Sequence, residues 1–503
     1  MKVYDVIVVG AGNGGLVAAA SCAQAGYKTL VLEKHNLPGG CATSFVRGRF
    51  EFEAALHELC NEATSPAQDS GRKIFERLGA EVPLTYESAL FRAIVKGENG
   101  YDVVIRPGYD GFLDSMEAAV PGCRDSVKAF IDLIGELDAA QDDMDANGIN
   151  PVRMFRKFGN FMRVAAHSAE YVMDALGIPE KAKSILCTYW GYLGVPTDDL
   201  NALHYISLVA AFVKTPPCMP YLRSHELSLS LVKALQGFGG EILYNTEVTR
   251  FLFDAKGTAV GVEAGGETYK AKRIISNVIP HNVFNRADPK AIPVRDRKLA
   301  NARKFGMSFI TVYLGLDCSM EELGIADYSV FISSDPDPRK QFEQRTEFGM
   351  YVVNCLNKAL PDASPEGTSM LFFTIPVMPG DFPEDLKPEE YKKWKNAVAE
   401  KYIRDYEQTM GVSVVEHIEE IAVATPVTFA RYLATPDGEI YGYASEKWDN
   451  VVSRSALMDN ENKIPHLYFC GGHGARGDGY PSAYITGAMT ANSVIESLRR
   501  EVK

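Results

Sequence analysis

The first residues that could do chemistry are glycines spaced to hold a phosphate. An apolar strand expected at Val6–Val9 leads directly into Gly10-x-Gly12-x-x-Gly15, and a helix of small residues follows. Gly10 permits a tight turn, Gly12 lets the backbone approach a pyrophosphate, and Gly15 lets the helix pack close to the sheet. Phosphates would lie on the N–H groups of the helix N-terminus, where the dipole favours negative charge. The spacing predicts a dinucleotide-binding unit.

An acidic residue completes this unit. The helix is followed by Gly26, a second expected strand at Thr29–Leu32, and Glu33 at its end. Glu33 lies where a carboxylate can accept hydrogen bonds from the hydroxyls of a ribose. A glycine triplet alone can occur by chance. The full order of strand, glycines, helix, strand and acid is much more specific for a dinucleotide. The neighbouring residues that we expect to contact the same cofactor are Asn13, Gly14 and Lys34.

Two further glycine-rich segments indicate which dinucleotide is bound. One is Pro38–Phe45, and the other is Gly471–Gly479, which follows an expected strand and opens a helix. Each can bring backbone N–H groups to a second part of a cofactor. Two such segments with only one GxGxxG favour FAD over NAD. Within them, the residues that we expect to contact FAD are Gly39, Gly40, Cys41, Ala42, Thr43, Gly472, Asp478 and Tyr480.

Composition narrows the function classes. The chain has 503 residues, of which 46% are hydrophobic and 23% charged, as in an ordinary globular protein. Its formal charge of −13 argues against a nucleic-acid partner, because binding phosphates requires a basic face. No run of 18 apolar residues occurs, and the first strand leaves no room for a signal peptide. With nine cysteines and no CxxC spacing, we expect a cytoplasmic protein without metal ligands.

The expected elements divide the chain into two interleaved domains. Strand and helix patterns alternate at the start and return at the end, while β-rich runs dominate from residue 305 onward. Between them, helical patterns cover roughly 109–140, 151–176 and 179–213. The fold class is therefore α/β, a Rossmann-type FAD-binding domain with a doubly wound parallel sheet and an inserted α+β substrate domain. The FAD-binding domain would comprise 1–85, 223–290 and 455–503, and the substrate domain 86–222 and 291–454.

Several motifs resemble one known family. The chain is similar to the FAD-dependent carotenoid desaturases, carotenoid isomerases and retinol saturases along essentially its whole length. The resemblance implies that the backbone of Val248 contacts the adenine of FAD, and that Glu33 and the first loop hold the ADP half. It also implies that Gly39–Gly40 and 471–483 lie along the flavin. The motifs that carry it are GAGNGG with Glu33-Lys34, GGCATSFVRGRFEFEAALHE (39–58), Glu247-Val248, RIISNV, TPVTFARYLATPDGEIYG (425–442) and the segment 471–488.

One position departs from the family pattern. Relatives usually carry Asp-x-Gly before the histidine that corresponds to His57, whereas this chain has Glu53-Ala54-Ala55. The resemblance implies that this turn lies near the isoalloxazine ring. The added methyl group of Ala55 would change how closely the substrate or the backbone approaches that ring.

Three residues are candidates for catalysis. His57 follows an apolar run and could donate to the flavin or relay a proton, although a core histidine satisfied by the backbone is the alternative. Arg476 could stabilise a developing anion, and Tyr480 could donate a proton to a reduced double bond. Both could instead make only structural contacts in their loop. Because a flavin supplies the hydride chemistry, the protein's role is orientation, exclusion of water and a proton.

The expected helical segments indicate a small hydrophobic substrate. Over 151–176, Met154, Phe155, Phe158, Phe161 and Met162 would share one helical face beside basic residues. Such a face could contact lipid headgroups, or it could be a core helix with a solvated edge. Methionine and aromatic residues recur over 205–222 and suit an apolar channel. We therefore expect a membrane-associated enzyme whose electron donor or acceptor is unidentified.

Three functions remain open from the sequence. The first is an FAD-dependent oxidoreductase that desaturates, saturates or isomerises carbon–carbon bonds of a long isoprenoid or polyene. The second is a flavin-dependent reductase or dehydrogenase of steroid-like enones, or an amine-oxidase-type enzyme, since a fold does not determine a substrate. The third is a non-catalytic carrier of FAD and lipid.

Overall fold

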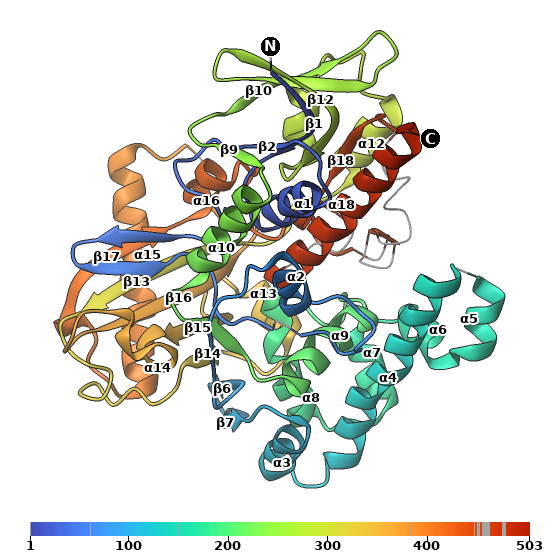
Figure 1. Ribbon diagram of the computed structural model, residues 1–503. Helices are drawn as coiled ribbons and strands as arrows, with labels where there is room; N and C mark the ends of the chain where they lie inside the picture. The colour runs from blue at the N-terminus through green and yellow to red at the C-terminus, as the bar shows by residue number, and fades with distance from the viewer. Residues whose placement is uncertain are drawn as a thin grey trace.

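The computed structural model describes residues 2–60, 62–148, 150–383, 385–446, 448–449, 453–454, 463–474 and 479–502. Its two large sheets and its helical lobe are seen in Figure 1. Within the described residues, every helix is too short or too polar to cross a bilayer.

The first sheet draws its strands from three distant parts of the chain. Its order is β10-β11-β12-β1-β2-β9, with β18 paired to the end of β12. Strand β1 runs parallel to both of its neighbours, and its residues Val6–Val9 are buried on both faces, as in a doubly wound sheet. Its strands are β1 (Lys2–Val9), β2 (Thr29–Leu32), β9 (Glu241–Leu243), β10 (Val248–Phe253), β11 (Ala259–Ala264), β12 (Glu267–Ser276) and β18 (Leu467–Phe469).

Small residues let three helices converge on this sheet. Helices α10 (Ser224–Gly237) and α18 (Tyr480–Val502) both contact α1 (Asn13–Gln24), and α18 lies beside α1 in Figure 1. A Cβ atom on Gly487 of α18 would lie 2.4 Å from the carbonyl oxygen of Gly14, so neither helix could approach with a larger residue there. The C-terminal helix is thereby held against the first glycine loop.

The second sheet contains both parallel and antiparallel pairs, and apolar residues cover both of its faces. Its order is β17-β13-β16-β15-β14-β6-β7, and only the β14–β6 pair is parallel. Alternation along β13 sends Ile310, Val312 and Leu314 toward α15 (Pro388–Met410) and Phe309 and Tyr313 toward the main core. Its strands are β6 (Phe91–Val95), β7 (Tyr101–Ile105), β13 (Ser308–Leu316), β14 (Ser329–Ser333), β15 (Met350–Cys355), β16 (Ser369–Val377) and β17 (Ile418–Ala424). The expected β-rich runs after residue 305 are confirmed.

The remaining elements connect the two sheets or form the helical lobe. Two small sheets pair β3 (Ser44–Arg47) with β4 (Phe50–Glu53) and β5 (Leu84–Tyr86) with β8 (Cys218–Pro220). The lobe comprises α3 (Tyr109–Ala119), α4 (Arg124–Asn147), α5 (Pro151–Lys157), α6 (Gly159–Ala165), α7 (Ala169–Ala175), α8 (Glu180–Leu186), η1 (Cys187–Tyr192) and α9 (Ala202–Lys214). The other helices are α2 (Gly71–Leu78), α11 (Pro280–Asn285), α12 (Val294–Ala302), α13 (Pro338–Glu343), α14 (Leu356–Ala359) and α16 (Pro426–Leu433).

The prediction of one helical face over 151–176 is wrong. Phe158 leaves the helical conformation with φ −130° and ψ 67°, so the segment becomes the separate helices α5, α6 and α7. Met154 and Phe161 are buried, whereas 72% of Phe155 is exposed. Because the segment is not one continuous helix, its apolar residues do not share one face.

Candidate active site

The first glycine loop opens the N-terminus of α1 to a large cavity. Gly10 has φ +93°, and a Cβ atom on Gly15 would lie 2.1 Å from the carbonyl oxygen of Gly10. Gly12 is the N-cap of α1 and contributes no side chain, which leaves the first N–H groups of the helix available to a ligand. The side-chain oxygen of buried Asn13 has no hydrogen-bond partner among the described residues. This cradle fits the phosphates of a dinucleotide.

Glu33 lies at the end of β2 and braces this loop. Its carboxylate accepts hydrogen bonds from the N–H of Ala11 (2.7 Å) and of His35 (2.8 Å), and it lines the cavity. Lys34 lines the cavity as well, and its Nζ donates to the carbonyl oxygen of Arg431 (2.6 Å). Val248, at the start of β10, is a further lining residue on this side. These positions surround the space that the adenosine half of a dinucleotide would occupy.

The second glycine segment lies against the first. The Gly39 N–H donates to the carbonyl oxygen of Ala11 at 2.7 Å, and Gly39 forms a bridge with Gly12. Gly39 and Gly40 have φ +116° and +64°, a region that favours glycine. Both line the cavity together with Cys41 and Thr43. Ala42, by contrast, is fully buried outside the lining, and its carbonyl oxygen accepts a hydrogen bond from Ser228 of α10.

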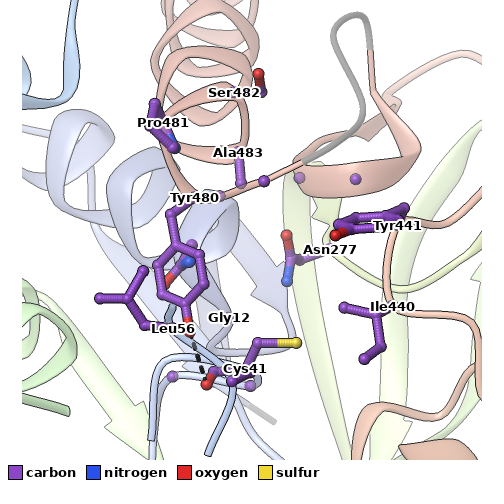
Figure 2. Close-up of a pocket in the computed structure, with 18 of the residues that line it drawn as sticks. Gly12, Cys41, Leu56, Asn277, Ile440, Tyr441, Tyr480, Pro481, Ser482 and Ala483 are labelled. Carbon is purple, nitrogen blue, oxygen red and sulfur yellow. Dashed lines mark hydrogen bonds between the residues drawn. The ribbon is translucent and has the colours of Figure 1, made fainter. Parts of the chain in front are cut away.

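The C-terminal segment closes the nucleotide end of the cavity. Gly472 lines it, and Tyr480 at the start of α18 points toward Cys41, whose carbonyl oxygen accepts its hydroxyl hydrogen bond at 2.9 Å (Figure 2). Burial raises the pKa of Tyr480 well above its usual value, so its hydroxyl stays neutral and is a weak acid. The predicted site residues Arg476 and Asp478 lie outside the described residues.

One cavity joins these loops to the helical lobe. It has a volume of about 1350 Å³ and runs without interruption from the glycine segments to α4, α6 and α9. This exceeds the range of about 300–1,000 Å³ that holds most single small ligands. The space therefore accommodates a cofactor and a second molecule. Its far end is lined by apolar side chains, including Met144, Phe161, Leu208 and Phe212, together with polar ones such as Asp138, Gln141 and Ser207.

His57 lies in the wall between the two ends. Its Nε2 lies 2.7 Å from Oγ1 of Thr374, and its ring stacks between those of Tyr192 and Phe372 at interplanar angles of 10° and 14°. Burial lowers the pKa of His57 to about 4, so the imidazole is neutral at neutral pH. As a neutral group it can position a ligand by hydrogen bonding, but it is a poor proton donor.

The turn before His57 is held by a buried carboxylate. Glu53 accepts hydrogen bonds from the N–H and hydroxyl of Ser224 (2.8 and 2.7 Å) and from the N–H of Leu56 (3.0 Å). These contacts tie the turn to the start of α10, while Ala54 and Ala55 line the cavity. The glutamate at this departure from the family pattern thus fixes the backbone beside the site.

Sequence reasoning missed two residues of the site. Asn277 follows β12 and lies between the glycine segments, since a Cβ atom on Gly12 or Gly471 would lie within 2.5 Å of its side chain (Figure 2). A polar residue after a buried parallel strand could have identified it. Glu58 lines the cavity next to His57 and is only 7% exposed. An acid within the apolar run LHEL was its available signal.

The comparisons with known proteins agree with this geometry. Residues 8–69 match the NAD(P)-binding Rossmann-like domain family. All-trans-retinol 13,14-reductase from Danio rerio is 25% identical over 98% of this chain and 86% of its own length. Prolycopene isomerase from Arabidopsis thaliana is 23% identical over 100% of this chain and 84% of its own length. Over nearly its whole length the chain is therefore similar to retinol reductases and carotenoid isomerases.

Solved structures show that the chain shares its fold with known proteins. An oxidoreductase from Methanosarcina mazei is 16% identical, with a TM-score of 0.66 over 98% of this chain and 100% of that one. Cyclohexylamine oxidase from Brevibacterium oxydans is 14% identical, with a TM-score of 0.61 over 99% of both chains. At this identity the likeness establishes the fold alone, and it confirms the predicted α/β class.

A small polar cluster lies outside the cavity. Asp317, Cys318 and His417 each bring one ligand-type atom within 4.8 Å of the others. Nδ1 of His417 lies 2.9 Å from Oδ1 of Asp317, and this side-chain contact holds the two residues together.

Proposed function

We propose that the chain is an FAD-dependent oxidoreductase that acts on carbon–carbon bonds of a long hydrophobic polyene. The observation that carries the proposal is the single cavity that connects a dinucleotide cradle to an apolar chamber. A substrate in that chamber would lie end-on to the cofactor and away from water. The relatives named as a retinol reductase and prolycopene isomerases support a polyene as the substrate class.

The residues present fit FAD. The first loop and Glu33 would hold the ADP half, and the segments at Gly39–Gly40 and Gly471–Gly472 would extend along the remainder. The unpartnered side-chain oxygen of Asn13 offers a further hydrogen-bond acceptor at this position. When bound, the flavin supplies a centre that accepts or donates hydride. The protein would position the polyene, exclude water and manage the proton.

The cofactor can be identified by releasing it. We expect the purified protein to be yellow and to yield close to one FAD per chain on denaturation, identified by its absorbance and mass. Colourless protein that binds no FAD on reconstitution would contradict the proposal. Release of NAD in place of a flavin would contradict it as well.

We also propose a peripheral contact with a membrane that faces the cytoplasm, through helix α5. Phe155 and Val152 are exposed there at 72% and 62%, next to the basic residues Arg156 and Lys157. Since the adjacent α6 contributes Phe161 to the cavity lining, this surface lies near the apolar chamber. A lipid-soluble substrate could enter at such a surface.

Replacing Phe155 with serine should weaken binding to anionic vesicles about fivefold. Partial burial of a phenylalanine side chain is worth about 1 kcal/mol, which corresponds to that factor. Cosedimentation with vesicles measures the change. The matched control is Val294→Ser, which removes another exposed apolar side chain (69% exposed) on α12. Equal binding of the wild type and the Phe155 variant would contradict the contact.

A further inference from the structure

A pair of buried glutamates lies beside the cavity. Glu58 is 7% exposed and lines the cavity wall, and Glu87 is 8% exposed in the layer behind it. Oε1 of Glu58 accepts a hydrogen bond from the hydroxyl of Tyr192 at 2.7 Å. Its Oε2 has no hydrogen-bond partner among the described residues, and neither has either carboxyl oxygen of Glu87. The described part of the chain places no lysine or arginine in ion-pair contact with either group.

Two such carboxyls cannot both be ionised. Burying an unpaired charge costs far more than protonating it, and a second negative charge nearby adds to the cost. Burial raises the pKa of Glu58 to about 8. Burial and the charge of Glu58 raise the pKa of Glu87 well above its usual value. Glu58 therefore carries a proton at neutral pH.

The other titratable groups around the pair are weaker acids or hold no proton to give. The hydroxyls of Tyr189, Tyr192 and Tyr328 have pKa values raised far above the usual range by burial. The thiols of Cys60 and Cys218 are likewise shifted upward by burial. His57 on the cavity side is neutral. Tyr480, the donor expected from the sequence, is a weak acid bonded to the backbone of Cys41.

We propose that Glu58 is the catalytic proton donor to the reacting double bond, and that Glu87 holds the proton that restores it. This role rests on the proposed function. The structural basis is the position of Glu58 in the cavity wall, one residue beyond His57, with one carboxyl oxygen unpartnered. In a desaturation, the reverse reaction, the Glu58 carboxylate would accept the proton that leaves the substrate.

The step balances for saturation of one double bond. A reduced flavin, when bound, would supply a hydride to one carbon, and the electron pair of that hydride would form the first new C–H bond. The π electron pair of the double bond forms the second C–H bond with the Glu58 proton. The O–H bond of Glu58 breaks and leaves a carboxylate, which Glu87 reprotonates. The products are the saturated bond, the oxidised flavin and one proton fewer on the glutamate pair.

Replacing Glu58 with glutamine tests this role in the holoenzyme. The flavin is reduced anaerobically, and its reoxidation by a polyene such as all-trans-retinol is followed in a single turnover. General acids contribute about 10²–10⁴-fold, so we expect the rate to fall at least 100-fold. FAD content and the dissociation constant of the polyene should change less than twofold. Glu58→Asp keeps a carboxyl group but shortens the side chain by one methylene. Its rate should lie between those of Glu58→Gln and the wild type.

A second readout does not need the substrate. The infrared band of a protonated buried carboxyl should be present in the wild type at pH 6.5, titrate near pH 8, and lose intensity in Glu58→Gln. Glu439→Gln is the matched control, because Glu439 is a fully buried glutamate that does not line the cavity. It should keep the wild-type rate of reoxidation.

The outcomes separate the two proposals. An active wild type with an equally active Glu58→Gln variant, or an unchanged carboxyl band, would overturn the proton role alone. A reduced wild type that transfers no electrons to any polyene would overturn the proposed function, and the proton role with it. If Glu58→Gln does not fold, an undiminished rate in Glu58→Asp would overturn the proton role.

Discussion

Replacing Gly39 with alanine is expected to weaken FAD binding about 100-fold. The Cβ atom would lie 1.9 Å from the carbonyl oxygen of Ala42 and 2.6 Å from Oγ of Ser228, at a φ of +116°. Backbone strain and overpacking of this kind cost about 3 kcal/mol together, which is a factor of about 100 in affinity. The loop would have to move away from Gly12, to which Gly39 is bridged. Equilibrium titration of the apoprotein with FAD measures the loss.

Gly26→Ala provides the matched control for this substitution. Gly26 also has a positive φ, +88°, but a Cβ atom there meets no other atom within 4 Å. Alanine at Gly26 should therefore lower the stability of the folded protein through backbone strain and leave the FAD affinity unchanged. Equal FAD affinity in Gly39→Ala and the wild type would show that the second glycine segment does not contact the cofactor.

The second large expected effect is on the pH dependence of stability. With a pKa of about 8 in the folded state and an ordinary value of 4.5, Glu58 holds its proton more tightly when folded. Its stabilising contribution is complete below pH 4.5 and is lost as the pH rises toward 8, because the unfolded state releases the proton first. Glutamine has no proton to release. Glu58→Gln should therefore be more stable than the wild type by about 4 kcal/mol at pH 8 and nearly equal to it at pH 4.5.

Chemical denaturation at a series of pH values measures this difference. Glu180→Gln is the control, because the side chain of Glu180 is 89% exposed and its replacement should leave the pH profile unchanged. Parallel profiles for the wild type and Glu58→Gln would mean that Glu58 is ionised in the folded protein. That result would also remove the basis for its role as a proton donor.

Local patterns were enough to predict the nucleotide end of the molecule. Gly10 and Gly15 have their roles because of backbone geometry that depends on residues close in sequence, and such geometry is recognisable without the fold. The buried strand over Ser308–Leu316 was equally clear, since both of its faces are apolar. The C-terminal glycine segment could be assigned to the same cofactor because it also follows an expected strand and opens a helix.

The features that the sequence could not predict depend on contacts between residues that are distant in the chain. Phe155 and Met154 share one short helix, and only tertiary packing decides which of them is buried. Ala42 belongs to a glycine-rich segment yet faces α10, because Gly39 turns the chain at that point. Burial raises the pKa of Glu58, and its neighbour Leu59 bridges to β8, which pairs with β5 next to Glu87.

The central claim is most directly tested by anaerobic half-reactions of the FAD-loaded protein. The flavin reduced with dithionite is offered carotenoids, retinoids and steroid enones as electron acceptors, and the oxidised flavin is offered amines as electron donors. The account predicts that a long polyene restores the oxidised flavin spectrum and that a product with one double bond fewer appears in equal amount. Reaction with the steroid enones alone, oxidation of the amines alone, or no reaction with any lipid would contradict it.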